Sequence, residues 1–171
     1  WAGEGTVAFA ANRRNNPESQ VAELLARGGQ LRGPTDHSVP VLAVRAAENR
    51  LCAVVFGYAC HCTTLSFYKW SGDYAGFAQI ALEQNHPDAM AMFYAGCGAD
   101  QNPLPRRSVE MCRKYGEALA AGVEDVLGKP MRPIAPRLQT AFAFVELDYE
   151  KTLSQPDLEA AAEKDIYQQR R

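Results

Sequence analysis

The sequence predicts an α/β fold in which helices flank a mixed β-sheet. Apolar runs at 51–59 and 89–96 have no polar face, which is typical of strands buried on both sides in an α/β sheet. Segments with helix start signals alternate with segments of strand character along the chain. With 171 residues, the chain is long enough for one domain with a substantial core.

Five segments have strand character and are bounded by turn-forming residues. Their ranges are 5–12, 39–46, 51–59, 89–96 and 140–149. Only the short sequence Ala-Glu-Asn-Arg joins the second to the third, which predicts that these two are antiparallel neighbours. Both alternating faces of 51–59 are apolar, so we expect this strand to be central and buried on both sides.

Four helices are expected, and each follows a residue that can cap its first turn. These cap residues are Asn16, Asp73, Ser108 and Ser154. Glycines are expected to end the first and third helices, and the third has an apolar stripe with steps of three and four residues. The fourth helix, 154–171, is expected to run off the end of the chain.

Composition excludes several classes of protein. Hydrophobic residues make up 47% and charged residues 22%, with a net charge of −2, which is ordinary for a globular protein. There is no basic run, which argues against a nucleic-acid partner, and no apolar stretch reaches the length of a membrane span. Five cysteines without a Cys-x-x-Cys spacing argue against a disulfide framework and a ribbon-type zinc site.

The ends of the chain suggest a piece of a longer protein. The sequence opens on Trp1 and closes in what reads as the middle of a helix. We therefore expect residues 1–171 to be a single partial domain, and the lack of a signal peptide then says nothing about the compartment.

A histidine stands between two cysteines directly after the central strand, in the stretch Tyr-Ala-Cys-His-Cys-Thr-Thr-Leu. An imidazole at the end of a rigid strand suits a metal ligand, although spacing alone favours a hydrogen-bonded structural role for His61. A nucleophile pair of Cys60 with His61 is disfavoured, because adjacent side chains on a strand point to opposite faces. Cys60 and Cys62 are expected to be small buried thiols, and the role of Cys97 stays open.

Two further segments carry candidate polar groups. Arg13 follows the first strand, where a guanidinium can bind an oxyanion or a carboxylate, although a solvated surface pair with Arg14 is the simpler interpretation. The loop Gly-Cys-Gly-Ala-Asp-Gln-Asn-Pro either presents Asp100 and Asn102 to a ligand or forms a plain turn.

The two apolar strands predict where these polar groups lie relative to one another. If 51–59 and 89–96 are parallel neighbours, the loops that follow them share one rim of the sheet. Ligands of open α/β sheets gather at the carboxyl ends of the strands. His61 and the glycine-rich loop are therefore expected at a common edge.

Taken together, four stretches resemble the N-terminal catalytic domain of the neutral/alkaline non-lysosomal ceramidase family. They are "ANRR" followed by "NPES", then "YACHCTTL", "SGDYAGFAQ" and "YAGCGADQNP". They occur in the order of the family's Asn-Arg block, its Ala-x-His segment, its Ser-x-Asp-x-x-Gly-aromatic-Ala segment and its glycine-rich loop before a proline. The resemblance covers about residues 1–128.

The resemblance implies a zinc-dependent amide hydrolase. It implies that His61 is one of two histidine zinc ligands and that Arg13 lies near the scissile carbonyl, with Asp100 organising its loop or supporting a ligand. The other histidine, a glutamate and a tyrosine that complete the family's zinc site fall outside this chain. The implied partner is a small-molecule or lipid amide, and family analogy implies a secreted, periplasmic or membrane-associated protein, with association at a membrane surface.

One departure from the family bears on the substrate. The family's ceramidases carry a serine beside the proline of the glycine-rich loop, whereas this chain has Asn102 there. An asparagine cannot act as a nucleophile, but its amide can orient a water or donate a hydrogen bond to an oxyanion. A water activated by zinc remains compatible with this sequence, and the substrate need not be ceramide.

Two other hypotheses stay open. The first is a ceramidase-like domain that has lost catalysis and keeps a binding or structural role, which the departure at Asn102 motivates. The second is a redox or thiol protein built on Cys60, Cys62 and Cys97.

Overall fold

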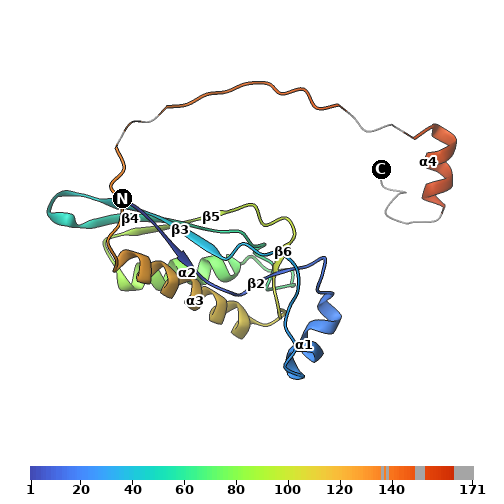
Figure 1. Ribbon diagram of the computed structural model, residues 1–171, viewed down its shortest axis with the longest axis horizontal. Coiled ribbons are helices and arrows are strands. Elements are labelled where there is room, and N and C mark those ends of the chain that lie inside the picture. Colours follow the sequence, from blue (N-terminus) through green and yellow to red (C-terminus); the bar gives the residue numbers. More distant parts are fainter. Residues whose placement is uncertain (136, 138, 149–152, 164–171) are drawn as a thin grey trace. The chain divides into compact units, whose positions relative to one another are not determined.

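A four-stranded mixed sheet forms the centre of the fold (Figure 1). The computed structural model describes residues 1–135, 137, 139–148 and 153–163. The strands are β1 (Ala2–Thr6), β3 (Ser38–Arg45), β4 (Leu51–Tyr58) and β5 (Met90–Ala95), in the order β1-β3-β4-β5. The β1–β3 and β3–β4 pairs are antiparallel, and the β4–β5 pair is parallel. The predicted α/β class and the antiparallel β3–β4 pair are confirmed.

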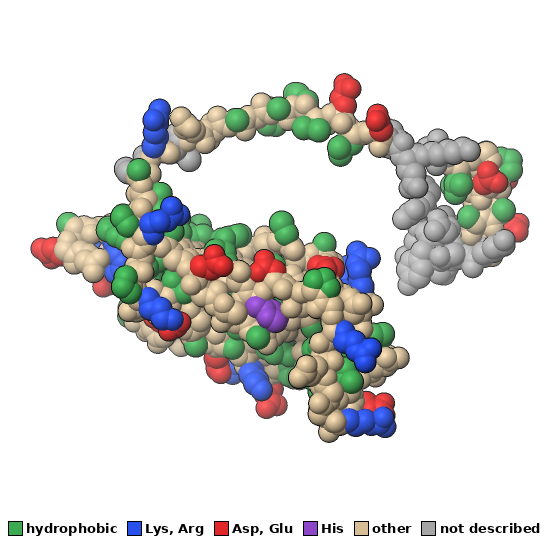
Figure 2. All heavy atoms as spheres, viewed as in Figure 1, with side chains coloured by type: hydrophobic (Ala, Val, Ile, Leu, Met, Phe, Trp, Pro, Cys, Tyr) green, Lys and Arg blue, Asp and Glu red, His purple; other side chains and the backbone are tan. Residues whose placement is uncertain are grey.

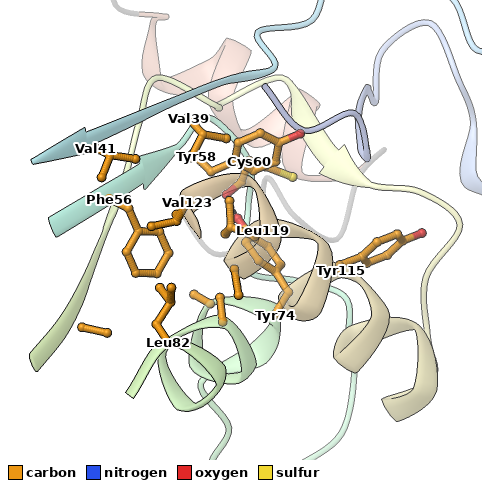
Figure 3. Packing of buried hydrophobic residues seen from close by; sticks show 14 of the residues in the cluster. Val39, Val41, Phe56, Tyr58, Cys60, Tyr74, Leu82, Tyr115, Leu119 and Val123 are labelled. Atoms are coloured by element: carbon orange, nitrogen blue, oxygen red, sulfur yellow. Dashed lines mark hydrogen bonds between the residues drawn. The ribbon is translucent and has the colours of Figure 1, made fainter. Parts of the chain in front are cut away.

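Two helices, α2 (Asp73–Asn85) and α3 (Val109–Leu127), cover one face of this sheet (Figure 1). The core lies between these helices and the sheet and includes the inward-pointing side chains of the strands (Figure 3). Its largest members with almost no exposure are Phe56, Tyr58, Tyr74, Leu82 and Leu119.

The opposite face of the sheet is not buried, which corrects the expectation for the central strand. Val54, Phe56 and Tyr58 of β4 point into the core, but of the alternate residues Leu51, Ala53 and Val55 are only partly buried. Hydrophobic side chains are visible on the side of the sheet away from the helices (Figure 2). The exposed members are Leu42, Val44, Met90, Met92 and Tyr94.

The strand expected over 5–12 is wrong as a single element, because the chain bends after Thr6. Residues 10–12 form a separate strand, β2 (Ala10–Asn12), which pairs with β6 (Gln101–Pro103) in a second, two-stranded sheet. The bend is fixed by the buried hydroxyl of Tyr58, which accepts the N–H of Ala10 at 3.1 Å and donates to the carbonyl of Val7. Periodicity along 5–12 does not reveal a contact with a side chain so far along the chain.

Two of the four expected helix caps are wrong. Helix α1 (Glu18–Ala26) begins after Pro17, and the buried Asn16 side chain instead donates to the carbonyls of Asn12 and Arg32, at 2.7 Å each. Helix α2 begins at Asp73 itself, with Gly72 before it as the cap residue. In both cases the polar side chain forms hydrogen bonds with a neighbouring loop instead of serving as the cap residue of the helix.

The caps expected at Ser108 and Ser154 are confirmed. Ser108 accepts the N–H of Met111 at 3.1 Å, and Gly128 ends α3. Ser154 caps α4 (Gln155–Ala162) and accepts the N–H of Asp157.

The strand expected over 140–149 does not form. Residues 140–148 have no regular secondary structure, and 149 lies outside the described residues. The part of the expected last helix after residue 163 also lies outside them. The only other short element among the described residues is a turn of 3₁₀-helix, η1 (Ala47–Asn49), which connects β3 to β4.

Contacts divide the chain into two units, residues 1–135 and 136–171. The first contains the sheet and α1 to α3, and the second contains α4. None of the helices in the described part of the chain combines the length and the apolar character needed to cross a bilayer.

Candidate functional site

The carboxyl ends of β4 and β5 lie side by side, as the expected common rim requires. The two strands are parallel in register from Ala53–Met90 to Tyr58–Ala95. The loops that follow are joined by backbone hydrogen bonds, from the N–H of His61 to the carbonyl of Gln101 at 3.0 Å and from Gly96 to Tyr58 at 3.0 Å. Residues 61 and 101 therefore come together at one edge.

The close approach of these loops depends on Gly98. A Cβ atom at this position would lie 2.4 Å from the carbonyl carbon of Ala59 and 2.5 Å from the nitrogen of Cys60. Backbone atoms cannot move aside as a flexible side chain can, so only glycine fits here.

The pairing of β2 with β6 brings the third predicted segment to the same place. Ala11 is opposite Asn102, and the N–H of Arg13 donates to the carbonyl of Asp100 at 2.7 Å. Three segments that are far apart in sequence, carrying Arg13, His61 and the pair Asp100 and Asn102, are thus directly hydrogen-bonded to one another.

One ring nitrogen of His61 contacts a backbone carbonyl. It is partly exposed, and its Nε2 lies 3.2 Å from the carbonyl oxygen of Ala99. A carbonyl only accepts hydrogen bonds, so Nε2 is the donor, and in the neutral imidazole Nδ1 then has the free lone pair. A histidine that binds a metal commonly donates its other ring nitrogen in this way.

Asn102 is buried, with 6% of its surface exposed, and its side chain is oriented by the neighbouring loop. Its Oδ1 lies 3.5 Å from the hydroxyl of Thr63. Its amide nitrogen has no hydrogen-bond partner among the described residues. This N–H₂ group is therefore a free donor within the described part of the site.

Asp100 organises the turn that presents Arg13. Its Oδ2 accepts the side-chain amide of the buried Asn12 at 2.8 Å, and the Oδ1 of Asn12 accepts the N–H of Arg14 at 3.0 Å. The Arg13 side chain itself is exposed and makes no hydrogen bond or ion pair with the described residues. Its guanidinium is thus available to an anionic or carbonyl group of a ligand.

An ion-pair cluster of Glu18, Arg106 and Arg107, which the sequence did not predict, holds the loop that contains His61 (the His61 loop) in place. Arg106 donates to the carbonyl and hydroxyl oxygens of Thr63, at 3.1 and 2.9 Å, and also to the carboxylate of Glu18. Arg107 donates to the same carboxylate. The two guanidinium groups lower the pKa of Glu18 from 4.5 to about 2. In the sequence, the Arg-Arg pair directly after the glycine-rich loop was the only indication of this cluster, and no pattern indicated that Glu18 takes part in it.

Asp73 anchors the other end of the same loop. Its buried carboxylate accepts the backbone N–H groups of Thr64 at 3.1 Å and Leu65 at 2.9 Å. It also accepts the N–H of Tyr74, whose hydroxyl donates to the carbonyl of Cys60 at 2.7 Å. Because a buried carboxylate with three N–H donors is well satisfied, this arrangement holds the loop in one conformation.

The cysteines follow the expectation only in part. Cys60 is buried, but Cys62 is exposed, because the strand ends before it and the chain turns outward. Cys97 is exposed as well, and all five thiols are free. Burial raises the pKa of the Cys60 thiol well above its ordinary range, which makes it a poor nucleophile.

The described residues do not complete a metal site. They contain no group of three or more His, Cys, Asp or Glu side chains that could hold a metal ion. His37 instead contacts the carbonyl of Ala10, and His86 contacts the carboxylate of Glu124. His61 fits a single ligand with a free Nδ1, and the other ligands would have to come from elsewhere.

The geometry defines an α/β protein with its polar groups gathered where two parallel strands end, and known structures share this fold. A ceramidase solved in complex with C2 superposes with a TM-score of 0.60 at 18% identity. The neutral ceramidase of Pseudomonas aeruginosa superposes with a TM-score of 0.58 at 19% identity. Each match covers 75% of this chain and 22% of the other. The chain thus has the fold of part of a neutral ceramidase and spans about a fifth of those proteins.

Sequence comparison adds nothing to this structural likeness. No protein-family profile matches the sequence, and no curated protein matches it.

Proposed function

We propose that this chain is part of the catalytic domain of a zinc-dependent amide hydrolase resembling neutral ceramidase, whose substrate need not be ceramide. The observation that carries the proposal is the convergence of Arg13, His61 and Asn102 on hydrogen-bonded segments at one rim of the sheet. The ceramidase-like fold supports a lipid amide as the substrate class.

Each residue has a role suited to its environment. Nδ1 of His61 would serve as one zinc ligand, and ligands outside the described residues would complete the set. Zinc, when bound, supplies a water of lowered pKa and polarises a carbonyl. Arg13 would bind the substrate's carbonyl oxygen as negative charge develops on it, and the free amide N–H₂ of Asn102 would donate to the same oxygen or orient a water. Asp100 would keep Arg13 in position through Asn12.

The test uses the full-length protein beside two histidine variants. Zinc content and hydrolysis of lipid and simple amides are measured for the wild type, for His61→Ala and for His86→Ala. His86 is the matched control, because it pairs with Glu124 rather than with the rim. We expect about one zinc per chain in the wild type and in the control, with both zinc and turnover lost in His61→Ala. Zinc retained in His61→Ala would refute the ligand role.

A second candidate is a ceramidase-like domain that binds without catalysis. Asn102 in place of the family's serine favours it. Zinc bound without turnover on any of the amides would favour this candidate. Turnover restored by Asn102→Ser would then identify residue 102 as the cause.

A further inference from the structure

An aromatic loop leaves the candidate site and reaches into solvent. It comprises residues 66–72, directly between the His61 loop and helix α2. Tyr68 and Trp70 have the relative exposures 110% and 104%, and Phe67 is 43% exposed. None of these rings makes a hydrogen bond or ring contact with the described residues. Large aromatic side chains bury far more surface than they expose in most proteins, so full exposure of two of them is unusual.

The base of the aromatic loop is fixed although its tip is free. Asp73 accepts the N–H of Leu65 at one end of the loop, and its own N–H donates to the hydroxyl of Ser71 at the other, at 3.0 Å. Both ends are thus tied to the buried residue Asp73, one through its carboxylate and the other through its backbone N–H. The loop therefore presents its tip from a rigid base.

The chemistry of the tip matches the interface of a lipid bilayer. Its sequence, Phe-Tyr-Lys-Trp, combines amphipathic rings with one cation and has no acidic residue. Tyrosine and tryptophan concentrate at the level of lipid headgroups, and lysine at this depth contacts anionic headgroups. A protein partner would need a contact area of about 800 Å² on each side, which a tip of four residues does not offer by itself.

We propose that the aromatic loop is a membrane-surface anchor, in which the rings of Phe67, Tyr68 and Trp70 insert at the headgroup level and Lys69 contacts anionic lipid. The loop starts five residues after His61, so insertion would hold the rim of the sheet against the bilayer. The inference goes beyond hydrolysis, since membrane binding by this loop stands whether or not the protein cleaves an amide.

The test is co-sedimentation of the full-length protein with vesicles of phosphatidylcholine, with and without phosphatidylglycerol. For the double variant Tyr68→Ser/Trp70→Ser we expect binding to both kinds of vesicle to weaken about tenfold or more. For Lys69→Gln we expect about fivefold weaker binding to the anionic vesicles and no change with the neutral ones. Ile80→Ser is the matched control, because Ile80 is an exposed apolar residue of α2, and it should bind as the wild type does.

Three results would overturn the proposal. They are a wild type that binds neither kind of vesicle, a double variant that binds as the wild type does, and a double variant with a clearly lowered melting temperature. The last would show that the tip packs against another part of the full-length chain. Two controls separate a failure of this proposal from a failure of the proposed hydrolase. His61→Ala should still bind vesicles, because its side chain is not part of the aromatic loop. Hydrolysis of a water-soluble amide should be the same in the double variant as in the wild type, because such a substrate does not require membrane binding.

Discussion

Replacement of Glu18 by glutamine tests whether the Glu18–Arg106–Arg107 cluster holds the candidate site together. The carboxylate accepts hydrogen bonds from both guanidinium groups, and Arg106 in turn holds Thr63. The pKa of Glu18 falls from 4.5 to about 2 in the folded protein, mainly because of the hydrogen bonds from Arg106 and then Arg107. At about 1.4 kcal/mol per pKa unit this shift corresponds to about 3 kcal/mol. The Glu18 side chain is 36% exposed, so solvent screens the interaction and we expect a loss of about 1–2 kcal/mol in the free energy of unfolding at pH 7.

The pH dependence gives the sharper test. A carboxyl whose pKa is lowered on folding stabilises the protein fully above its unfolded pKa, and this contribution is lost as the pH falls through the folded pKa. The difference in stability between wild type and Glu18→Gln should therefore be constant above about pH 5 and shrink between about pH 4.5 and 2. Urea unfolding at several pH values measures it.

Glu23→Gln is the matched control in the same helix. Among the residues that the structure describes, Glu23 pairs only with Arg27, and both side chains are mostly exposed, so its replacement should change stability by no more than about 0.5 kcal/mol. A loss for Glu18→Gln no larger than for Glu23→Gln, or one that stays constant down to low pH, would refute the role given to the cluster.

Three further substitutions test the packing that supports the rim. Gly98→Ala should destabilise the protein by about 1–3 kcal/mol and reduce any activity, because the new Cβ meets the backbone of Ala59. Thermal melts measure the change in stability. Gly76→Ala is the control, because a Cβ there meets nothing within 4 Å, and it should be neutral or stabilising. Ser108→Ala should lose about 1 kcal/mol in urea unfolding because α3 loses its cap, and an unchanged midpoint would contradict this. Leu119→Ala, at a fully buried position, should lose about 2–5 kcal/mol by the same measurement, and a loss below 1 kcal/mol, as for a surface residue, would contradict the core position.

Much of the fold could be predicted because it rests on local patterns. The antiparallel β3–β4 pair follows from a short connection between apolar runs, and the start of α3 follows from a serine before an amphipathic stripe. The errors arise where a side chain serves a distant segment. Asn16 and Asp73 resemble helix caps locally, but each is used to hold a loop.

The meeting of the loop that contains His61 with the glycine-rich loop could be predicted from the sequence, but the way in which the segment of Arg13 joins them could not. His61 and Asp100 lie after strands, where polar groups are conspicuous against apolar runs. The pairing of β2 with β6, which brings in Arg13, depends on the hydroxyl of Tyr58 and has no local signal. Glu18 was equally hidden, because an acidic residue in the first turn of a helix is ordinary there.

The hydrogen bonds that hold the His61 loop determine how a loss of function in His61→Ala should be interpreted. Within the described part of the chain the imidazole makes one hydrogen bond, to the carbonyl of Ala99, so its removal should cost only about 0.5–1.5 kcal/mol. The backbone N–H of residue 61 still donates to Gln101, and Arg106 still holds Thr63. Because the loop is held by bonds that do not involve the imidazole, it should keep its conformation in the variant. A loss of zinc in a variant that melts like the wild type would then report on the missing ligand and not on unfolding of the rim.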